Sequence, residues 1–259
     1  MWKYLRLVFV FVPKLIWAYF AWIFAYSRHP EKYPLSQRYA KAHKLCLQFV
    51  KDIRLDVHHQ GLGYIRRQKP QYIIVNHFGF LDPIVIMAIT DKPLLFVAKK
   101  EARKMPFIGR ILQSIDAVFL NREDLKQEVK AMSKVKKILQ GGRTVVIFPE
   151  GTRNRKYSAD LGMFKPGAFK VPEVLDVEIV PVAVIGTQFA LLLSTNWKTF
   201  PIEVLIMPPY LPSSEKLGSV GLSKKFQELM QSMVNDIREK ENNRISAFLT
   251  KRQKELISN

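Results

Sequence analysis

After Pro70 the sequence alternates short apolar runs with segments of helical periodicity. Six runs are rich in Val, Ile, Leu and Phe, as strands buried on both faces of a sheet are. They are Tyr72–Asn76, Leu94–Ala98, Ala117–Leu120, Thr144–Phe148, Glu178–Ile185 and Ile202–Met207. The helical segments are Pro83–Ile89, Phe107–Ser114, Glu123–Leu139 and Leu222–Leu249. This alternation predicts an α/β fold with a mostly parallel central sheet flanked by helices.

The N-terminus is apolar and aromatic from Leu7 to Tyr26, interrupted only by Pro13 and Lys14. A helix of about 20 apolar residues is long enough to span a bilayer. A lysine at the bilayer centre costs about 2.5–3.5 kcal/mol, and a proline bends a helix. These penalties favour a monotopic helical membrane anchor over residues 1–30, followed by an α/β domain over 31–259. A transmembrane span and a buried core helix are the alternatives.

The chain is strongly basic: 41 Lys and Arg against 22 Asp and Glu give a net charge of +19. Such a charge attracts anionic lipid, nucleic acid or acidic proteins. Nothing in the sequence matches a nucleic-acid recognition module, and the apolar N-terminus favours a membrane surface. The segment Gln37–Arg54 mixes basic and apolar residues at helical spacing, typical of a helix on anionic lipid or of an ordinary surface helix. The single cysteine, Cys46, excludes a disulfide scaffold.

The first apolar run ends in a candidate chemical pair. In QYIIVNHFGFLDP, His77 ends the run, and Asp82 follows after four intervening residues at the start of a helix. A carboxylate on one imidazole nitrogen fixes the tautomer, and the other nitrogen then takes a proton from a hydroxyl. No G-x-S-x-G elbow supplies a serine nucleophile, so the pair would activate a hydroxyl of the substrate. Alternatively, Asp82 only caps the helix and His77 is a core residue.

A second cluster, FPEGTRNRK, covers Phe148–Lys156 directly after a strand-like run. Ligands of open α/β sheets bind at the carboxyl ends of strands, which is where this cluster begins. The guanidinium of Arg153 suits a phosphate, Glu150 can accept hydrogen bonds, and Gly151 allows close backbone approach. An ordinary polar turn with solvated arginines is the alternative.

Three more cations, Lys99, Lys100 and Arg122, also end apolar runs and add positive charge to the same edge, unless each is simply solvated. The chain has no phosphate loop G-x-x-x-x-G-K-[ST], no G-x-G-x-x-G and no H-E-x-x-H or cysteine cluster. The sequence therefore predicts neither a bound metal nor a nucleotide cofactor.

Four motifs stand in the order seen in the glycerolipid acyltransferases: NHFGFLD, KKEARKMPFIG leading to Arg122, FPEGTR, and VPV. FKPGA, over Phe164–Ala168, also resembles the sequence that follows the third motif in that family. The resemblance runs from about Asp56 to Met207 and is strongest to the bacterial enzymes that acylate 1-acyl-sn-glycerol-3-phosphate. One departure is Asn121, because an acidic residue often precedes the arginine in the family.

The resemblance implies transfer of an acyl group from acyl carrier protein or coenzyme A to the 2-hydroxyl of lysophosphatidic acid, giving phosphatidic acid for phospholipid biosynthesis. His77 would be the general base and Asp82 would orient it. Backbone N–H groups near Lys99 and Lys100 would stabilise the oxyanion. The substrate-binding residues would be Arg122, Glu150, Gly151, Thr152, Arg153, Lys100 and Lys165.

The resemblance further implies no metal or other cofactor, and a place at the cytoplasmic face of a bacterial cell membrane, peripheral or monotopic. The expected partners are the membrane phospholipid surface, lysophosphatidic acid and the thioester donor. Two other functions remain open. One is acylation of a different acceptor, either glycerol 3-phosphate or another lysophospholipid. The other is a basic membrane-peripheral protein that binds lipid without catalysis.

Overall fold

The computed structural model describes residues 2–66, 68–121, 123–154, 160–191 and 199–246. Its described strands form one seven-stranded sheet in the order β1-β7-β6-β2-β5-β3-β4. The five strands from β6 to β4 are parallel, whereas β7 runs antiparallel to β6 and carries β1 parallel to itself. The prediction of a mostly parallel sheet is confirmed. The strands are β1 Leu55–Gln60, β2 Tyr72–Val75, β3 Leu94–Lys99, β4 Val118–Leu120, β5 Thr144–Ile147, β6 Ile179–Ile185 and β7 Phe200–Ile206.

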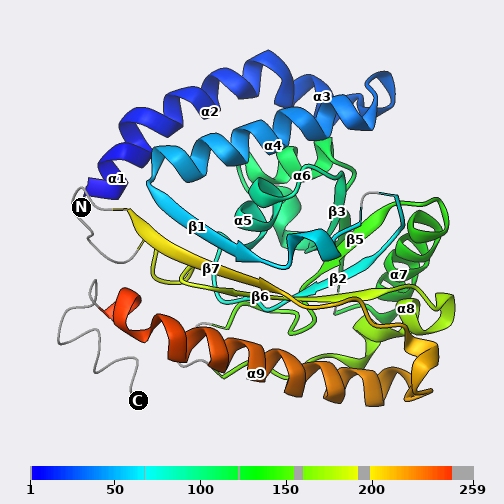
Figure 1. Cartoon of the computed structure of the whole chain (residues 1–259). Helices are drawn as coiled ribbons and strands as arrows, with labels where there is room; N and C mark the ends of the chain where they lie inside the picture. The colour runs from blue at the N-terminus through cyan, green and yellow to red at the C-terminus, as the bar shows by residue number, and fades with distance from the viewer. Residues whose placement is uncertain (1, 67, 122, 155–159, 192–198, 247–259) are drawn as a thin grey trace.

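Helices cover both faces of the sheet (Figure 1). α4, α5 and α6 lie on one face, and α7, α8 and α9 lie on the other. α7 carries a side-chain cap, because the carboxylate of Asp124 accepts the backbone N–H of Gln127. The helices are α4 Leu35–Asp52, α5 Asp82–Ile89, α6 Ile108–Ser114, α7 Leu125–Gln140, α8 Lys170–Leu175 and α9 Gly218–Ser246.

The apolar N-terminus forms one continuous helical segment, the N-terminal rod (Trp2–Arg28), which lies along α4 (Figure 1). It consists of α1 Trp2–Arg6, a wider turn Leu7–Phe11, α2 Val12–Ala18, a second wider turn Tyr19–Ile23 and α3 Phe24–Arg28. Pro13 lies in the first turn of α2, after the wider turn, where a missing backbone N–H is tolerated.

One side of the rod is buried in the protein and the other is exposed. The ring of Phe11 packs edge-on against Phe49 of α4, with the centroids 4.9 Å apart. On the opposite side Phe9, Trp17 and Phe20 are 69–78% exposed. The stretch Tyr4–Arg28 is long and apolar enough to cross a membrane. Of its most apolar 18 residues, 22% are buried inside the protein.

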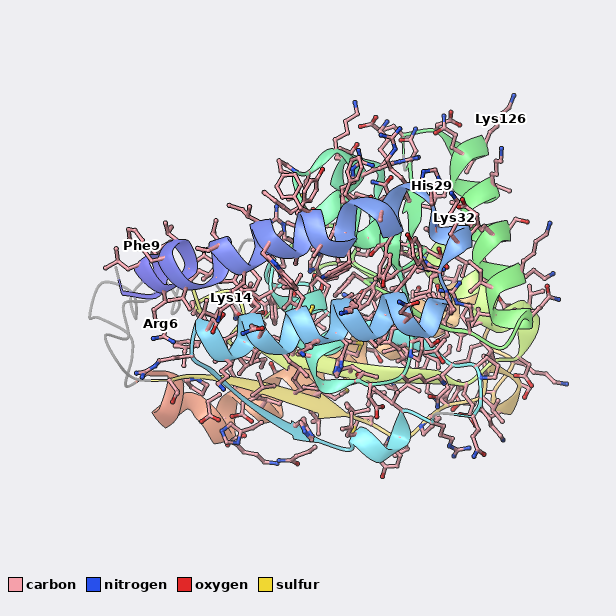
Figure 2. The ribbon with its side chains drawn as sticks, turned by 90° about the horizontal axis from the view of Figure 1, so that it is seen from above. Arg6, Phe9, Lys14, His29, Lys32 and Lys126 are labelled. Carbon is pink, nitrogen blue, oxygen red and sulfur yellow. The ribbon has the colours of Figure 1, made fainter. Side chains whose placement is uncertain are left out.

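Lys14, the charge that interrupts the apolar stretch, faces the protein (Figure 2). Its Nζ lies 2.8 Å and 3.0 Å from the two carboxylate oxygens of Asp52, the last residue of α4. The Nε of Arg6 donates to the backbone carbonyl of the same residue. Lys14 and Arg6 of the rod are therefore paired with the end of α4, while apolar rings cover the outer side of the rod.

Candidate functional site

The candidate site lies where β2, β5 and β6 end. β2 has β6 on one side and β5 on the other, and the three strands are parallel, so their carboxyl ends meet at one edge of the sheet. Asn76, the residue after β2, is fully buried and exchanges two hydrogen bonds with the backbone of Val184 in β6, at 2.9 Å and 2.7 Å. This pair of hydrogen bonds fixes the end of β2 and therefore the backbone position of the next residue, His77.

His77 and Asp82 are in direct contact. Nδ1 of His77 lies 2.8 Å from Oδ2 of Asp82, whose side chain is fully buried, whereas the imidazole retains 19% exposure. The same oxygen accepts the backbone N–H of Gly79 at 2.9 Å, and the hydroxyl of Thr187 donates to Oδ1. With Asp82 ionised, Nδ1 of the neutral ring carries the proton, so Nε2 is the nitrogen that can accept one.

Asp82 does not cap a helix, and this alternative from the sequence is wrong. Leu81 occupies the capping position of α5, which has no side-chain cap. The carboxylate of Asp82 instead faces the loop that follows β2 and the residue Thr187 after β6. A Cβ placed on Gly79 would lie 3.0 Å from the backbone carbon of Thr187, so a side chain here would be tightly crowded by the segment after β6.

Glu150, three residues past β5, connects its own loop to the loop of His77 and to the segment of Gly162. Its Oε1 accepts the backbone N–H of His77 and its Oε2 that of Gly162, both at 2.7 Å. The side chain is 3% exposed, and burial raises its pKa above the ordinary value although both N–H groups act in the opposite direction. Both oxygens are thus engaged by the protein's own backbone.

The rest of the FPEGTR segment forms a loop that runs from Glu150 to a contact with His77. Gly151 turns the chain with a φ of 76°, a conformation that favours glycine. Thr152 and Arg153 follow with exposed side chains. The N–H of Asn154 donates to the carbonyl of His77 at 2.7 Å, which holds this loop beside the imidazole.

The other cations expected from the sequence are placed differently. Lys165 has an exposed side chain, and its backbone N–H bonds to the carbonyl of Pro149, next to Glu150. Lys100 has its ammonium 3.1 Å from Glu123 Oε2, in a solvent-exposed pair. Arg122 lies outside the described residues. The structure therefore brings together His77, Asp82 and Glu150, with the segments of Arg153 and Lys165 alongside.

Two contributors to this site, Thr187 and Asn76, were not predicted from the sequence. A signal for Thr187 exists: it stands two residues after the apolar run ending at Ile185, the same offset that His77 has from Val75. Because the carboxyl ends of parallel strands lie at one edge of the sheet, this offset indicates that Thr187 belongs to the same site as His77.

Other chemistry has little support in the part of the chain that is described. Within it, no group of three or more His, Cys, Asp and Glu side chains is arranged to hold a metal ion. Burial raises the pKa of the Cys46 thiol to about 12, so a reactive thiolate is disfavoured at neutral pH. The chemically available group is the imidazole of His77, which packs against the ring of Phe148 at 4.3 Å between centroids.

Comparison with known proteins gives consistent results. A family model described as Acyltransferase matches residues 56–185. A probable 1-acyl-sn-glycerol-3-phosphate acyltransferase of Mycoplasma genitalium is 32% identical over 169 residues, covering 62% of this chain and 61% of that protein. A 1-acyl-sn-glycerol-3-phosphate acyltransferase of Helicobacter pylori is 35% identical over 115 residues, covering 44% and 48%.

The fold also resembles a solved structure. The crystal structure of the 1-acyl-sn-glycerophosphate acyltransferase of Thermotoga maritima superposes with a TM-score of 0.72, at 22% identity, over 91% of this chain and 95% of that one. At this identity the likeness concerns the fold, including the arrangement of helices around the sheet. The matched part of this chain spans about three fifths of the length of its Mycoplasma relatives.

Proposed function

The chain belongs to the acyltransferase family, and we propose that it transfers a fatty acyl group from an acyl thioester to the 2-hydroxyl of 1-acyl-sn-glycerol-3-phosphate, giving phosphatidic acid. The observation that carries the proposal is the bond between His77 and the buried carboxylate of Asp82, with the ring partly exposed. Relatives named as 1-acyl-sn-glycerol-3-phosphate acyltransferases support this acceptor.

The chemistry follows from the tautomer. Nε2 of His77 takes the proton of the acceptor hydroxyl as its oxygen attacks the thioester carbonyl, while Asp82 stabilises the imidazolium that forms. The tetrahedral intermediate then collapses, breaking the carbon–sulfur bond, and the imidazolium returns its proton to the departing thiolate. We assign oxyanion stabilisation to backbone N–H groups near Lys99 and Lys100. No metal or cofactor takes part in this scheme.

For acceptor binding we assign the phosphate to Arg153 and Arg122, with Lys165 and Lys100 adding positive charge. Gly151 and Thr152 shape the loop beside the imidazole. Glu150 acts by holding the backbone of His77, because both its oxygens already accept N–H groups. Arg153 is supported by its exposure and by the bond that ties the next residue to His77.

The exposed aromatic side of the N-terminal rod supports membrane association. We propose that the rod is monotopic and faces the cytoplasmic leaflet. A transmembrane rod would have to leave α4 and separate Lys14 from Asp52, a carboxylate that is only 8% exposed. Both the acyl carrier protein and coenzyme A thioesters are acidic and suit a chain of net charge +19.

Thiol release tests the proposal. The purified chain is given acyl carrier protein or coenzyme A thioester, with lysophosphatidic acid, glycerol 3-phosphate or no acceptor. We expect thiol release and phosphatidic acid only when lysophosphatidic acid is present, and neither product with His77→Ala. Equal release with glycerol 3-phosphate would move the chain to another acceptor. Lipid binding without thiol release from any donor would make it a non-catalytic lipid-binding protein.

A further inference from the structure

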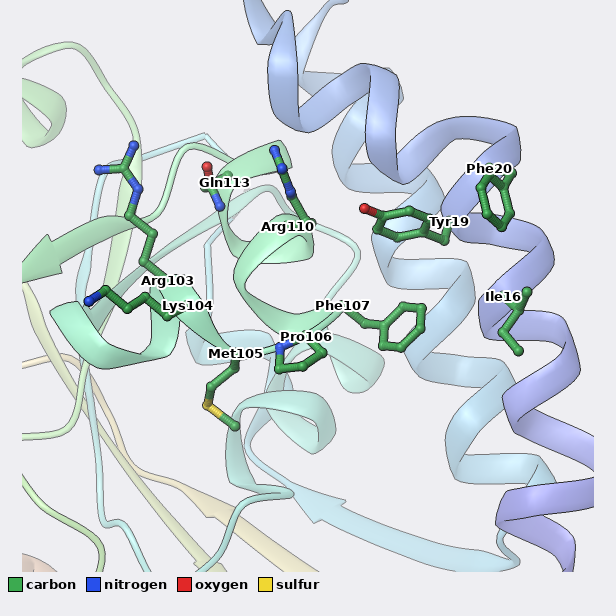
Figure 3. Close-up of a pocket in the computed structure, with 10 residues that line it drawn as sticks. All are labelled: Ile16, Tyr19, Phe20, Arg103, Lys104, Met105, Pro106, Phe107, Arg110 and Gln113. Atoms are coloured by element: carbon green, nitrogen blue, oxygen red, sulfur yellow. The ribbon is translucent and has the colours of Figure 1, made fainter.

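A groove lies between the N-terminal rod and the segment that precedes and includes α6 (Figure 3). It has a volume of about 750 Å³. Ile16, Tyr19 and Phe20 form the wall on the rod. The other wall consists of Arg103, Lys104, Met105, Pro106, Phe107, Arg110 and Gln113. None of these residues belongs to the hydrogen-bonded cluster around His77 and Glu150.

The groove combines unpaired cations with exposed apolar side chains. Within the described residues, Arg103, Lys104 and Arg110 form no ion pair with a carboxylate. The two guanidinium groups instead lie over aromatic rings, Arg103 over Phe119 at 5.8 Å and Arg110 over Phe24 at 5.9 Å. These contacts hold planar phosphate-binding groups in place without neutralising their charge.

Phe107 joins the two walls and has a strained backbone. Its φ of 58° and ψ of −54° are rare for a residue with a side chain, and such conformations cost of the order of 1–3 kcal/mol. The conformation directs its ring toward the rod, where it meets Tyr19 edge-on with the centroids 5.4 Å apart (Figure 3). Such strain persists where the surrounding structure holds the residue in place. Here the contact between Phe107 and Tyr19 joins the apolar parts of the two walls.

We propose that this groove binds one anionic phospholipid of the bilayer. The phosphate would lie among Arg103, Lys104 and Arg110, and an acyl chain would lie along Ile16 and Phe20. An apolar wall would contribute nothing to a free phosphate ion. It also continues onto the exposed aromatic side of the rod, where Phe20 is 78% exposed, and this continuity favours lipid over an acidic protein or nucleic acid. The bound lipid would hold the rod against the α/β domain.

Native mass spectrometry from a non-ionic detergent, with phosphatidylglycerol added, tests the proposal. The groove variant carries Arg103→Gln, Lys104→Gln and Arg110→Gln. The matched control removes the same charge from exposed lysines of α7: Lys126→Gln, Lys130→Gln and Lys134→Gln. Figure 2 shows Lys126 well away from the rod. We expect one retained lipid per chain in the wild type and the control, and retention about tenfold weaker in the groove variant.

Equal weakening in both triple variants would overturn the proposal, because diffuse charge would then explain binding. A second arm tests the apolar wall with Phe20→Ser, which keeps every cation and should also weaken retention. Unchanged retention in Phe20→Ser, or displacement of the lipid by inorganic phosphate, would assign the groove to a free phosphate instead. His77→Ala should retain the lipid fully, so failure of this proposal is distinguishable from failure of the proposed acyl transfer.

Discussion

The His77 site and the groove beside the N-terminal rod satisfy their charged groups in opposite ways. At the site, each oxygen of Asp82 and Glu150 accepts a hydrogen bond from the protein, and both carboxylates are buried. In the groove, the three cations are without carboxylate partners among the described residues, and apolar side chains stand exposed. A group that moves a proton must be held in one geometry, whereas a surface that binds lipid must leave its charges available.

Removing the imidazole should have the largest effect. With His77→Ala, turnover should fall by about 10²–10⁴-fold, the usual contribution of a positioned general base. The thermal midpoint should change little, because the ring is partly exposed and the carboxylate of Asp82 keeps its bonds from Gly79 and Thr187. The measurement is product formation beside thermal unfolding, with His59→Ala on the exposed edge strand β1 as the control. Near-normal turnover in folded His77→Ala would remove the site from the mechanism.

Glu150→Gln tests whether the carboxylate is structural. A glutamine is nearly isosteric but offers one acceptor oxygen, so either the N–H of His77 or that of Gly162 would face an NH₂ group. We expect a loss of about 1–3 kcal/mol in the free energy of unfolding, measured by urea denaturation, together with lower activity. The penalty comes from the lost acceptor, since burial raises the pKa of Glu150 while the two N–H groups favour its ionised form. An unchanged unfolding midpoint would contradict this.

Thr187→Val tests a positioning role. Valine keeps the shape of threonine but removes the hydroxyl that donates to Asp82. We expect kcat to fall about tenfold, the equivalent of about 1.4 kcal/mol for one bond to a charged group, with the acceptor KM unchanged. Thr187→Ser, which keeps the hydroxyl, should have most of the wild-type rate. A rise in KM without a fall in kcat, or no rescue by serine, would give Thr187 a purely structural role.

The sequence predicts a region well when neighbouring residues encode it, and poorly when the region depends on contacts between residues far apart in the chain. His77 and Glu150 follow apolar runs and Asp82 starts the helix after the first run, so the carboxyl ends of parallel strands bring all three to one edge. β1 was missed because it is an exposed edge strand whose polar residues, such as Asp56 and His59, form no apolar run. The antiparallel direction of β7 has no signature in its composition. The groove depends on packing between residues near positions 16 and 107, a contact without any local pattern.

The smallest effect should come from the pair that joins the rod to α4, Lys14 and Asp52. Lys14 is 39% exposed and Asp52 8%, so solvent screens one partner and not the other. A double-mutant cycle with Lys14→Met and Asp52→Asn, measured by urea unfolding in detergent, should give a coupling energy of about 1 kcal/mol. Lys14→Met alone should exceed the double variant in cost, because it leaves a buried carboxylate without its ammonium. A coupling near zero would mean that apolar contacts such as Phe11 on Phe49 hold the rod unaided. In that case the His77 site would be held in place by hydrogen bonds, whereas the rod, with its exposed aromatic side, would be held in place by apolar packing alone.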